Sequence, residues 1–136
     1  MSGKAFLDTN VLIYSYGKAE PLKQRQALEA IGTGEVWIST QVIIEFVNVS
    51  HRKLKTPWPD IQLSLIELHE NYDILVNSLA TITQATRLAD RYGFSWFDAL
   101  IVSSALECGC DTLYSEDLQH GQLIEQSLRV MNPFMA

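Results

Sequence analysis

The residues of this chain whose types are best suited to chemistry are four carboxylates, each isolated in an apolar or turn-forming stretch. They are Asp8, Glu45, Asp98 and Asp117. An unpaired charge in apolar surroundings loses its hydration, so such a residue needs a cationic partner, a proton or a metal ion. Carboxylate oxygens are hard ligands that suit Mg²⁺ or Mn²⁺. If the fold brings the four together, the sequence predicts metal-assisted chemistry.

The elements that must position these acids alternate between short β-like runs and longer helical runs. This pattern favours an α/β sandwich with a mainly parallel sheet. The predicted strands span residues 4–7, 35–38, 73–76 and 112–114, with 128–131 as a fifth. We therefore expect four to five strands flanked by helices. At 136 residues, the chain has the length of one ordinary domain, and we expect a single domain over residues 1–136.

The predicted elements place two acids at strand ends and two on helices. Asp8 and Asp117 fall where strands end, and ligands of open α/β sheets bind beyond the carboxyl ends of the strands. Asp98 falls in the first turn of a helix, where the partial positive charge of the N-terminus favours a carboxylate. Glu45 has apolar neighbours within its helix, so we expect it to face something other than bulk water. Each acid alone also fits an ordinary cap, turn or ion pair, and only the set of four favours a common site.

Composition limits the class of protein. With 47% apolar and 19% charged residues, the chain is typical of globular proteins. No apolar stretch reaches the roughly 20 residues that span a bilayer, and no signal peptide is evident, so we expect a cytoplasmic protein without a membrane partner. The net charge of −6 argues against strong non-specific binding to nucleic acid. Without the four acids, however, 12 acidic residues face 10 basic ones, which stays compatible with a metal-dependent nuclease.

A short basic run follows Glu45 on the same predicted helix. Arg52 lies seven residues after Glu45, which is two turns along the same face and about 10 Å away. Arg52 and Lys53 are therefore candidate contacts for a substrate phosphate at the rim of the site. The alternative is a solvated helix end whose cations complement the helix dipole.

The tryptophans and cysteines have simpler interpretations. We expect Trp37 and Trp96 in the core, and Trp58, which lies between two prolines, exposed as a candidate contact for a partner protein. Cys108 and Cys110 are separated by one glycine, too close for an ordinary structural disulfide. We expect two reduced thiols beside a helix-ending glycine.

The stretches around the four acids carry a resemblance to a known family. They are Leu7-Asp8-Thr9-Asn10, the mid-helix Glu45, Trp96-Phe97-Asp98-Ala99-Leu100-Ile101 and Tyr114-Ser115-Glu116-Asp117. In this order they resemble the signatures of PIN-domain ribonucleases. Their spacing and the chain length are closest to the VapC-type toxins of type II toxin–antitoxin pairs. The motifs are weak singly and specific as an ordered set, which covers the chain from its first strand to its last acid.

The resemblance implies a PIN-like three-layer sandwich that acts as a metal-dependent endoribonuclease. It implies an acidic site for Mg²⁺ or Mn²⁺ made of Asp8, Glu45, Asp98 and Asp117, supported by Asn10 and Ser115. Asp117, two places after Ser115, fits the family pattern better than its rival Glu116. A toxin role further implies an RNA substrate, a cognate antitoxin protein and a homodimer.

The expected reaction is hydrolysis of an RNA phosphodiester by metal-activated water. Asp8 and Asp98 are the foremost candidates for direct ligands. Glu45 either ligates the metal or holds and deprotonates the water, and Asp117 completes a second or outer-shell site. One metal ion or two would be consistent with these residues.

Several other functions fit parts of this pattern. A PIN-domain nuclease with a non-toxin role in RNA processing would share the acids, and an inactive PIN-like binding module would keep the fold. A haloacid-dehalogenase-type phosphatase needs a second aspartate where this chain has Asn10. A phosphoacceptor receiver domain needs an acid pair at the first strand and a late lysine, and the sequence has neither.

Overall fold

Six short strands form one central sheet in the computed structural model, which describes residues 3–135. In chain order they are β1 (Lys4–Leu7), β2 (Glu35–Ser39), β3 (Asp73–Leu75), β4 (Thr112–Tyr114), β5 (Leu123–Ile124) and β6 (Leu128–Met131). Across the sheet the order is β3-β2-β1-β4-β6-β5, and every pairing is parallel except that of β5 with β6. The central strands are the most apolar, and Phe6, Leu7 and Leu113 are fully buried.

The expectation of four to five strands was therefore one strand short. The missed strand, β5, contains only two residues, so it is too short to show the alternation that identifies a strand in a sequence. It pairs with β6 through a turn in which Glu125 and Gln126 both have positive φ angles. Neither residue belongs to the Asn-Gly or Asp-Gly type that signals a hairpin in a sequence.

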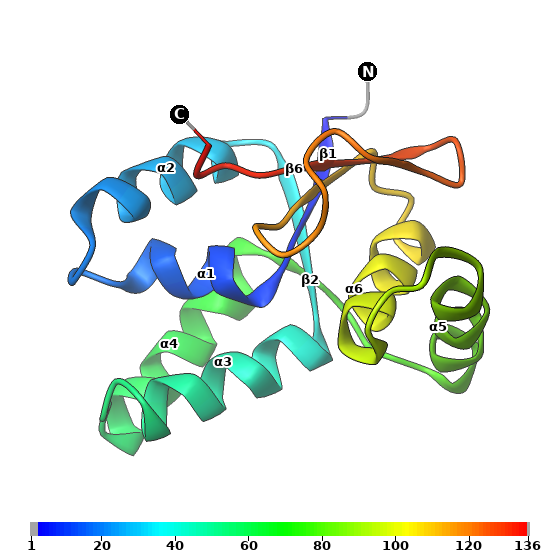
Figure 1. The fold of residues 1–136 in the computed structure, drawn as a ribbon. Helices are drawn as coiled ribbons and strands as arrows, with labels where there is room; N and C mark the ends of the chain where they lie inside the picture. Colours follow the sequence, from blue (N-terminus) through cyan, green and yellow to red (C-terminus); the bar gives the residue numbers. More distant parts are fainter. Residues whose placement is uncertain (1–2, 136) are drawn as a thin grey trace.

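Six helices cover the sheet. They are α1 (Thr9–Tyr16), α2 (Pro21–Ile31), α3 (Thr40–Arg52), α4 (Trp58–Asn71), α5 (Leu79–Tyr92) and α6 (Trp96–Glu107). Figure 1 shows α1 to α4 gathered on one side of the sheet and α5 with α6 on the other, which gives the predicted three-layer α/β sandwich. Serine side chains cap the helices that begin near the acids: Ser39 accepts from the Val42 N–H at 3.3 Å, and Ser95 does the same for Asp98.

The parallel pairing brings three chain segments to one edge of the sheet. β1 pairs with β2 on one side and with β4 on the other, so all three strands end at the same edge. Asp8 follows β1, α3 begins directly after β2, and Asp117 lies three residues beyond the end of β4. This topology, rather than closeness in sequence, is what brings the acids together.

The exposure of the tryptophans and cysteines follows the sequence-based expectations in part. Trp58 is half exposed, and Cys108 and Cys110 are buried free thiols, as predicted. Trp96 is 40% exposed rather than in the core, whereas the buried residues of α6 lie from Ala99 onward. Trp37 is half-buried on β2. Within residues 3–135, no helix has the length and apolarity needed to cross a membrane.

Candidate active site

Asp8 is fixed at the point where β1 gives way to α1. Its side chain caps α1, and one carboxylate oxygen accepts a hydrogen bond from the Thr9 N–H at 2.7 Å. The other oxygen accepts from the hydroxyl of Ser115 at 2.8 Å. Only 6% of the residue is exposed. Asp8 is therefore a buried carboxylate that is held at both oxygens.

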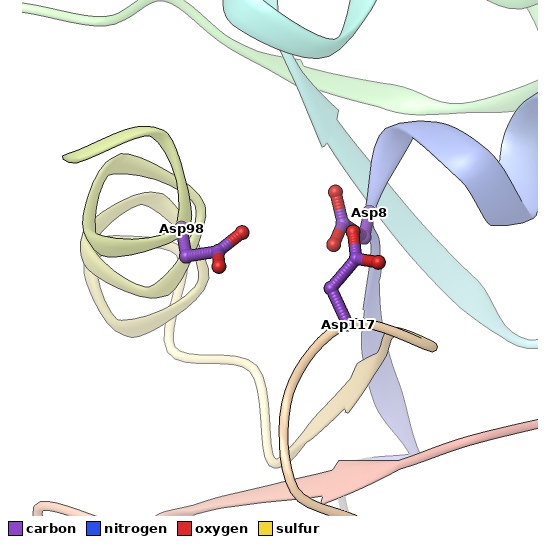
Figure 2. A group of neighbouring side chains, drawn as sticks. All are labelled: Asp8, Asp98 and Asp117. Carbon is purple, nitrogen blue, oxygen red and sulfur yellow. The ribbon is translucent and has the colours of Figure 1, made fainter. Parts of the chain in front are cut away.

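Asp98 and Asp117 converge on Asp8 from two other segments. Figure 2 shows Asp98 pointing from α6 across to Asp8 and Asp117, which lie side by side. Each of the three offers an oxygen, and these oxygens lie within 4.8 Å of one another. Asp98 is half-buried and Asp117 is exposed, so the cluster opens to solvent on one side. This is a geometry in which one cation can contact all three carboxylates.

Ser115 links two of the three acids. Its hydroxyl donates to Asp8 and accepts from the backbone N–H of Asp117 at 3.2 Å, and the residue is fully buried. The hydroxyl thus orients the Asp8 carboxylate and fixes the loop that carries Asp117. Ser115 is one of the two supporting residues that the family resemblance implies, and these contacts are consistent with that role.

The electrostatics of the cluster suit a cation. Burial raises the pKa of Asp8 to about 6, and the negative charges of Asp117 and Asp98 act in the same direction, against the hydrogen bonds from Ser115 and Thr9. The pKa of Asp117 is also raised, chiefly by partial desolvation of its carboxylate and then by the charges of Asp98 and Glu116. Within residues 3–135, none of the ion pairs includes any of the three aspartates. Three oxygen donors without a cationic partner are a donor set that fits Mg²⁺ or Mn²⁺.

Glu45 lies beside this cluster without joining it. It is half-buried on α3, and it is not one of the acids whose oxygens lie within 4.8 Å of one another in the described residues. The Thr9 hydroxyl donates a hydrogen bond to its carboxylate. Because the Thr9 N–H binds Asp8, one threonine connects both acids. Thr9 is not among the site residues predicted from the sequence, although it lies inside the stretch Leu7-Asp8-Thr9-Asn10.

The structure separates Glu116 from Asp117. One carboxylate oxygen of Glu116 accepts from the side-chain amide of Asn10 at 3.2 Å, and the other lies 3.6 Å from the Lys23 ammonium. That ammonium also donates to the Tyr14 hydroxyl at 3.2 Å. Glu116 is therefore turned away from the cluster that contains Asp117. Asn10 therefore contacts the residue that precedes Asp117 rather than Asp117 itself.

The two candidate phosphate contacts lie farther away. Arg52 is the last residue of α3 and Lys53 is its C-cap, and both are exposed. They do not contact the aspartate cluster, although they continue the helix that carries Glu45.

We expect Ser115→Ala to lower catalysis and to raise the pKa of Asp8 further. The substitution removes a donor from a buried carboxylate, which costs about 1.5–3 kcal/mol of unfolding free energy when that carboxylate is charged. Loss of a group that orients a metal ligand typically reduces metal affinity or activity about 10–100-fold. Metal titrations and cleavage rates between pH 5 and 8, bounds chosen around the Asp8 pKa of about 6, would measure both effects.

Ser103 provides a matched control, since its fully buried hydroxyl donates to the Thr81 carbonyl at 2.8 Å on the α5–α6 side. Ser103→Ala should lower stability without changing metal affinity. Equal effects of the two variants on metal affinity would contradict the role given to Ser115.

Comparisons with known proteins agree with this fold. The family model of the PIN domain matches residues 5–123. A search among curated proteins gives no match. Among solved structures, a toxin–antitoxin complex from Klebsiella pneumoniae aligns with a TM-score of 0.71 at 23% identity, covering 97% of this chain and 99% of that one.

Two further structures have the same fold. VapC20 of Mycobacterium tuberculosis, described as a sarcin–ricin loop cleaving toxin, aligns with a TM-score of 0.66 at 18% identity, covering 82% of this chain and 88% of that one. VapBC2 from Rickettsia felis, bound to a DNA fragment from its promoter, aligns with a TM-score of 0.65 at 20% identity, covering 95% and 99%. At such identities the likeness shows the fold, whereas the family model covers most of the sequence. The chain therefore belongs to the PIN-domain family.

Proposed function

We propose that this protein is a metal-dependent endoribonuclease that hydrolyses RNA phosphodiester bonds. The observation that carries the proposal is the cluster of Asp8, Asp98 and Asp117 at the carboxyl edge of a parallel sheet, with no cationic side chain paired to it among the described residues. Membership of the PIN-domain family supports the same reaction.

In the proposed site, Asp8, Asp98 and Asp117 hold Mg²⁺ or Mn²⁺ through carboxylate oxygens. The bound ion supplies Lewis acidity, which lowers the pKa of water and neutralises charge on the phosphate. The hydrogen bonds from Thr9 and Ser115 keep the Asp8 oxygens oriented before the substrate arrives.

Glu45 is proposed as the proton acceptor of the reaction. It lies outside the three-aspartate cluster, connected to it through Thr9, and is half-buried. A carboxylate at this place can take the proton from the attacking water while that oxygen forms its bond to phosphorus and the bond from phosphorus to the leaving ribose oxygen breaks. The leaving oxygen then takes a proton from solvent water. Arg52 and Lys53, beyond Glu45 on the same helix, contact the backbone of the substrate in this proposal.

We also propose that the chain, as a single domain over residues 1–136, acts as the toxin of a toxin–antitoxin pair in the cytoplasm. This rests on the likeness of its fold to proteins described as toxins or toxin–antitoxin complexes. The proposal includes a cognate antitoxin protein and a homodimer. Expression without the antitoxin should arrest growth, and expression of Asp8→Asn should not. Growth arrest by Asp8→Asn as strong as that by the wild type would contradict the toxin proposal.

The nuclease proposal is tested with the purified protein and end-labelled single-stranded RNA. We expect endonucleolytic fragments with Mg²⁺ or Mn²⁺ and none with excess EDTA, because the aspartates alone provide no Lewis acid. Activity in EDTA, or inactivity with both ions across a panel of structured and unstructured RNAs, would contradict the proposal. A parallel assay with p-nitrophenyl phosphate separates this activity from that of a phosphatase.

A further inference from the structure

We propose that the turn between α3 and α4 is a second contact site for single-stranded RNA, where a nucleobase stacks on Trp58 and phosphates bind Arg52 and Lys55. The inference deepens the proposed function and rests on it for the identity of the ligand. In Figure 1 this turn lies at the end of α3 that is farthest from β2.

The turn contains a hollow with a cationic wall. The hollow has a volume of about 700 Å³ and is lined by His51, Arg52, Lys55, Thr56, Pro57 and Trp58. Together with Lys53, this segment has three cations within four positions, in a chain whose net charge is −6. None of the ion pairs within residues 3–135 uses these three side chains. A concentrated positive charge without protein partners suits a polyanion.

Two aromatic rings that line the hollow, those of Trp58 and His51, stack on each other. The rings of Trp58 and His51 stack with centroids 3.8 Å apart and planes inclined by 19°, and Trp58 remains 50% exposed. His51 thus supports the indole on one side while much of the ring stays open to solvent. Exposed aromatic rings beside cations are the usual platform for single-stranded nucleic acid, because every base has a face that can stack.

The backbone holds the cations in place. The Thr56 N–H donates to the Ser50 carbonyl at 2.9 Å, and the Leu54 N–H donates to the Val49 carbonyl at 3.1 Å, which closes the end of α3. Lys55 adopts a left-handed conformation with φ of 57°. Glycine is the common residue at this place after a helix, because a side chain there meets steric strain. A lysine at such a position adds charge where conformation alone would favour glycine.

The position of the turn relative to the acids suits one continuous strand. Arg52 follows Glu45 by seven residues on α3, so both lie on the same face, about 10 Å apart along the helix axis. A few nucleotides of one strand can span that distance. Cations that merely complement the helix dipole would not need an exposed tryptophan beside them. Cations together with an exposed tryptophan therefore favour RNA binding over cations that only complement the helix dipole.

The proposal is tested by RNA binding without cleavage. Fluorescence anisotropy of a labelled single-stranded RNA is measured in EDTA, over a range of salt concentrations. We expect Trp58→Leu to bind about tenfold more weakly with an unchanged salt dependence, and Trp58→Phe to keep most of the affinity. Arg52→Gln and Lys55→Gly should each reduce the slope of log K against log salt by about 0.7, as loss of one phosphate contact does.

Arg25 offers the matched control, since it is an exposed arginine on α2 that pairs with Glu29. Arg25→Gln should leave both the affinity and the slope at wild-type values. Thermal unfolding of each variant checks the fold, and Arg52→Gln, at an exposed helix end, keeps the test valid if Trp58→Leu is unstable. Unchanged RNA affinity in Trp58→Leu together with unchanged slopes in the two cation variants overturns the proposal, even if a protein partner is then found to cover the hollow.

The outcome of this binding test does not depend on whether the protein cleaves RNA. A wild-type protein that cleaves RNA while all variants bind it equally well would overturn this contact site and leave the proposed nuclease intact. If the wild type cleaves no RNA with Mg²⁺ or Mn²⁺, while the variants lose affinity and salt dependence as described, the result would support the contact site and contradict the nuclease. Absence of any RNA binding in EDTA by the wild type would overturn the contact site.

Discussion

Asp8→Asn is expected to reduce RNA cleavage about a thousandfold or more, while it makes the metal-free protein more stable at pH 7. The loss of activity follows from the removal of one charged oxygen donor from the site proposed to hold the catalytic ion, which is worth several kcal/mol of transition-state stabilisation. Asn keeps the shape of the side chain. Its carbonyl oxygen can still accept from the Thr9 N–H, so the cap of α1 is retained.

Asp8→Asn raises stability although it lowers activity, because the charged Asp8 carboxylate is unfavourable in its buried site. Its pKa is about 6 in the folded protein, against the ordinary value of 3.8 for an aspartate carboxyl. Between these values the folded state binds more protons than the unfolded state, so the free energy of unfolding falls as pH rises. The stabilisation is complete below about pH 4 and is lost above about pH 6, and it amounts to about 3 kcal/mol.

Urea unfolding in EDTA at pH 4.5 and 7.5 measures this effect. The wild type should lose stability between the two pH values, and Asp8→Asn should lose much less, because it lacks the carboxyl with the raised pKa. A variant that is less stable than the wild type at pH 7.5, or that keeps more than a tenth of its activity, would contradict this account of Asp8.

Two neighbouring acids provide the matched comparison. Asp117→Asn removes a carboxylate that lies within the cluster, whereas Glu116→Gln changes one that is turned toward Asn10 and Lys23. We expect the first to cost at least tenfold more activity than the second. The reverse order would show that Glu116 is the fourth acid of the site.

Much of the fold could be predicted from local patterns. Pro21 at the start of α2, Gly93 at the end of α5 and the apolar run of β1 are signals that act over a few residues, and each falls where the structure has the boundary. Ser39 caps α3, and serine directly before a helix is one of the local signals that mark a helix start. The two-residue strand β5 had no such signal, because its pairing depends on the position of β6 rather than on its own sequence.

The candidate site could be predicted only in part. Strand ends and a helix start suffice to bring Asp8, Asp98 and Asp117 toward one sheet edge. The separate position of Glu45 depends on a hydrogen bond from Thr9, 36 residues earlier in the chain. The orientation of Glu116 depends in the same way on Lys23. Contacts between residues so far apart follow from tertiary packing, which no local pattern encodes.

The second large effect is stabilisation of the protein by the divalent ion. At a Mg²⁺ or Mn²⁺ concentration one hundred times its dissociation constant, the free energy of unfolding should rise by about 2.7 kcal/mol. For a domain of this length, that corresponds to a rise of roughly 8 °C in Tm. The reason is that the ion replaces repulsion among three carboxylates by attraction, and the unfolded chain does not hold the three together.

The same stabilisation should depend on pH in a way that identifies the residues responsible. Below about pH 6 the folded protein binds a proton at Asp8, and the ion must displace it, so the rise in Tm should shrink by pH 5. Asp8→Asn should show little rise at either pH. Glu29→Gln, which alters an exposed acid on α2, should respond as the wild type does. Because the proton and the ion compete for one carboxylate, a rise in Tm that is the same at pH 5 and pH 7 would place the bound ion somewhere other than the three aspartates.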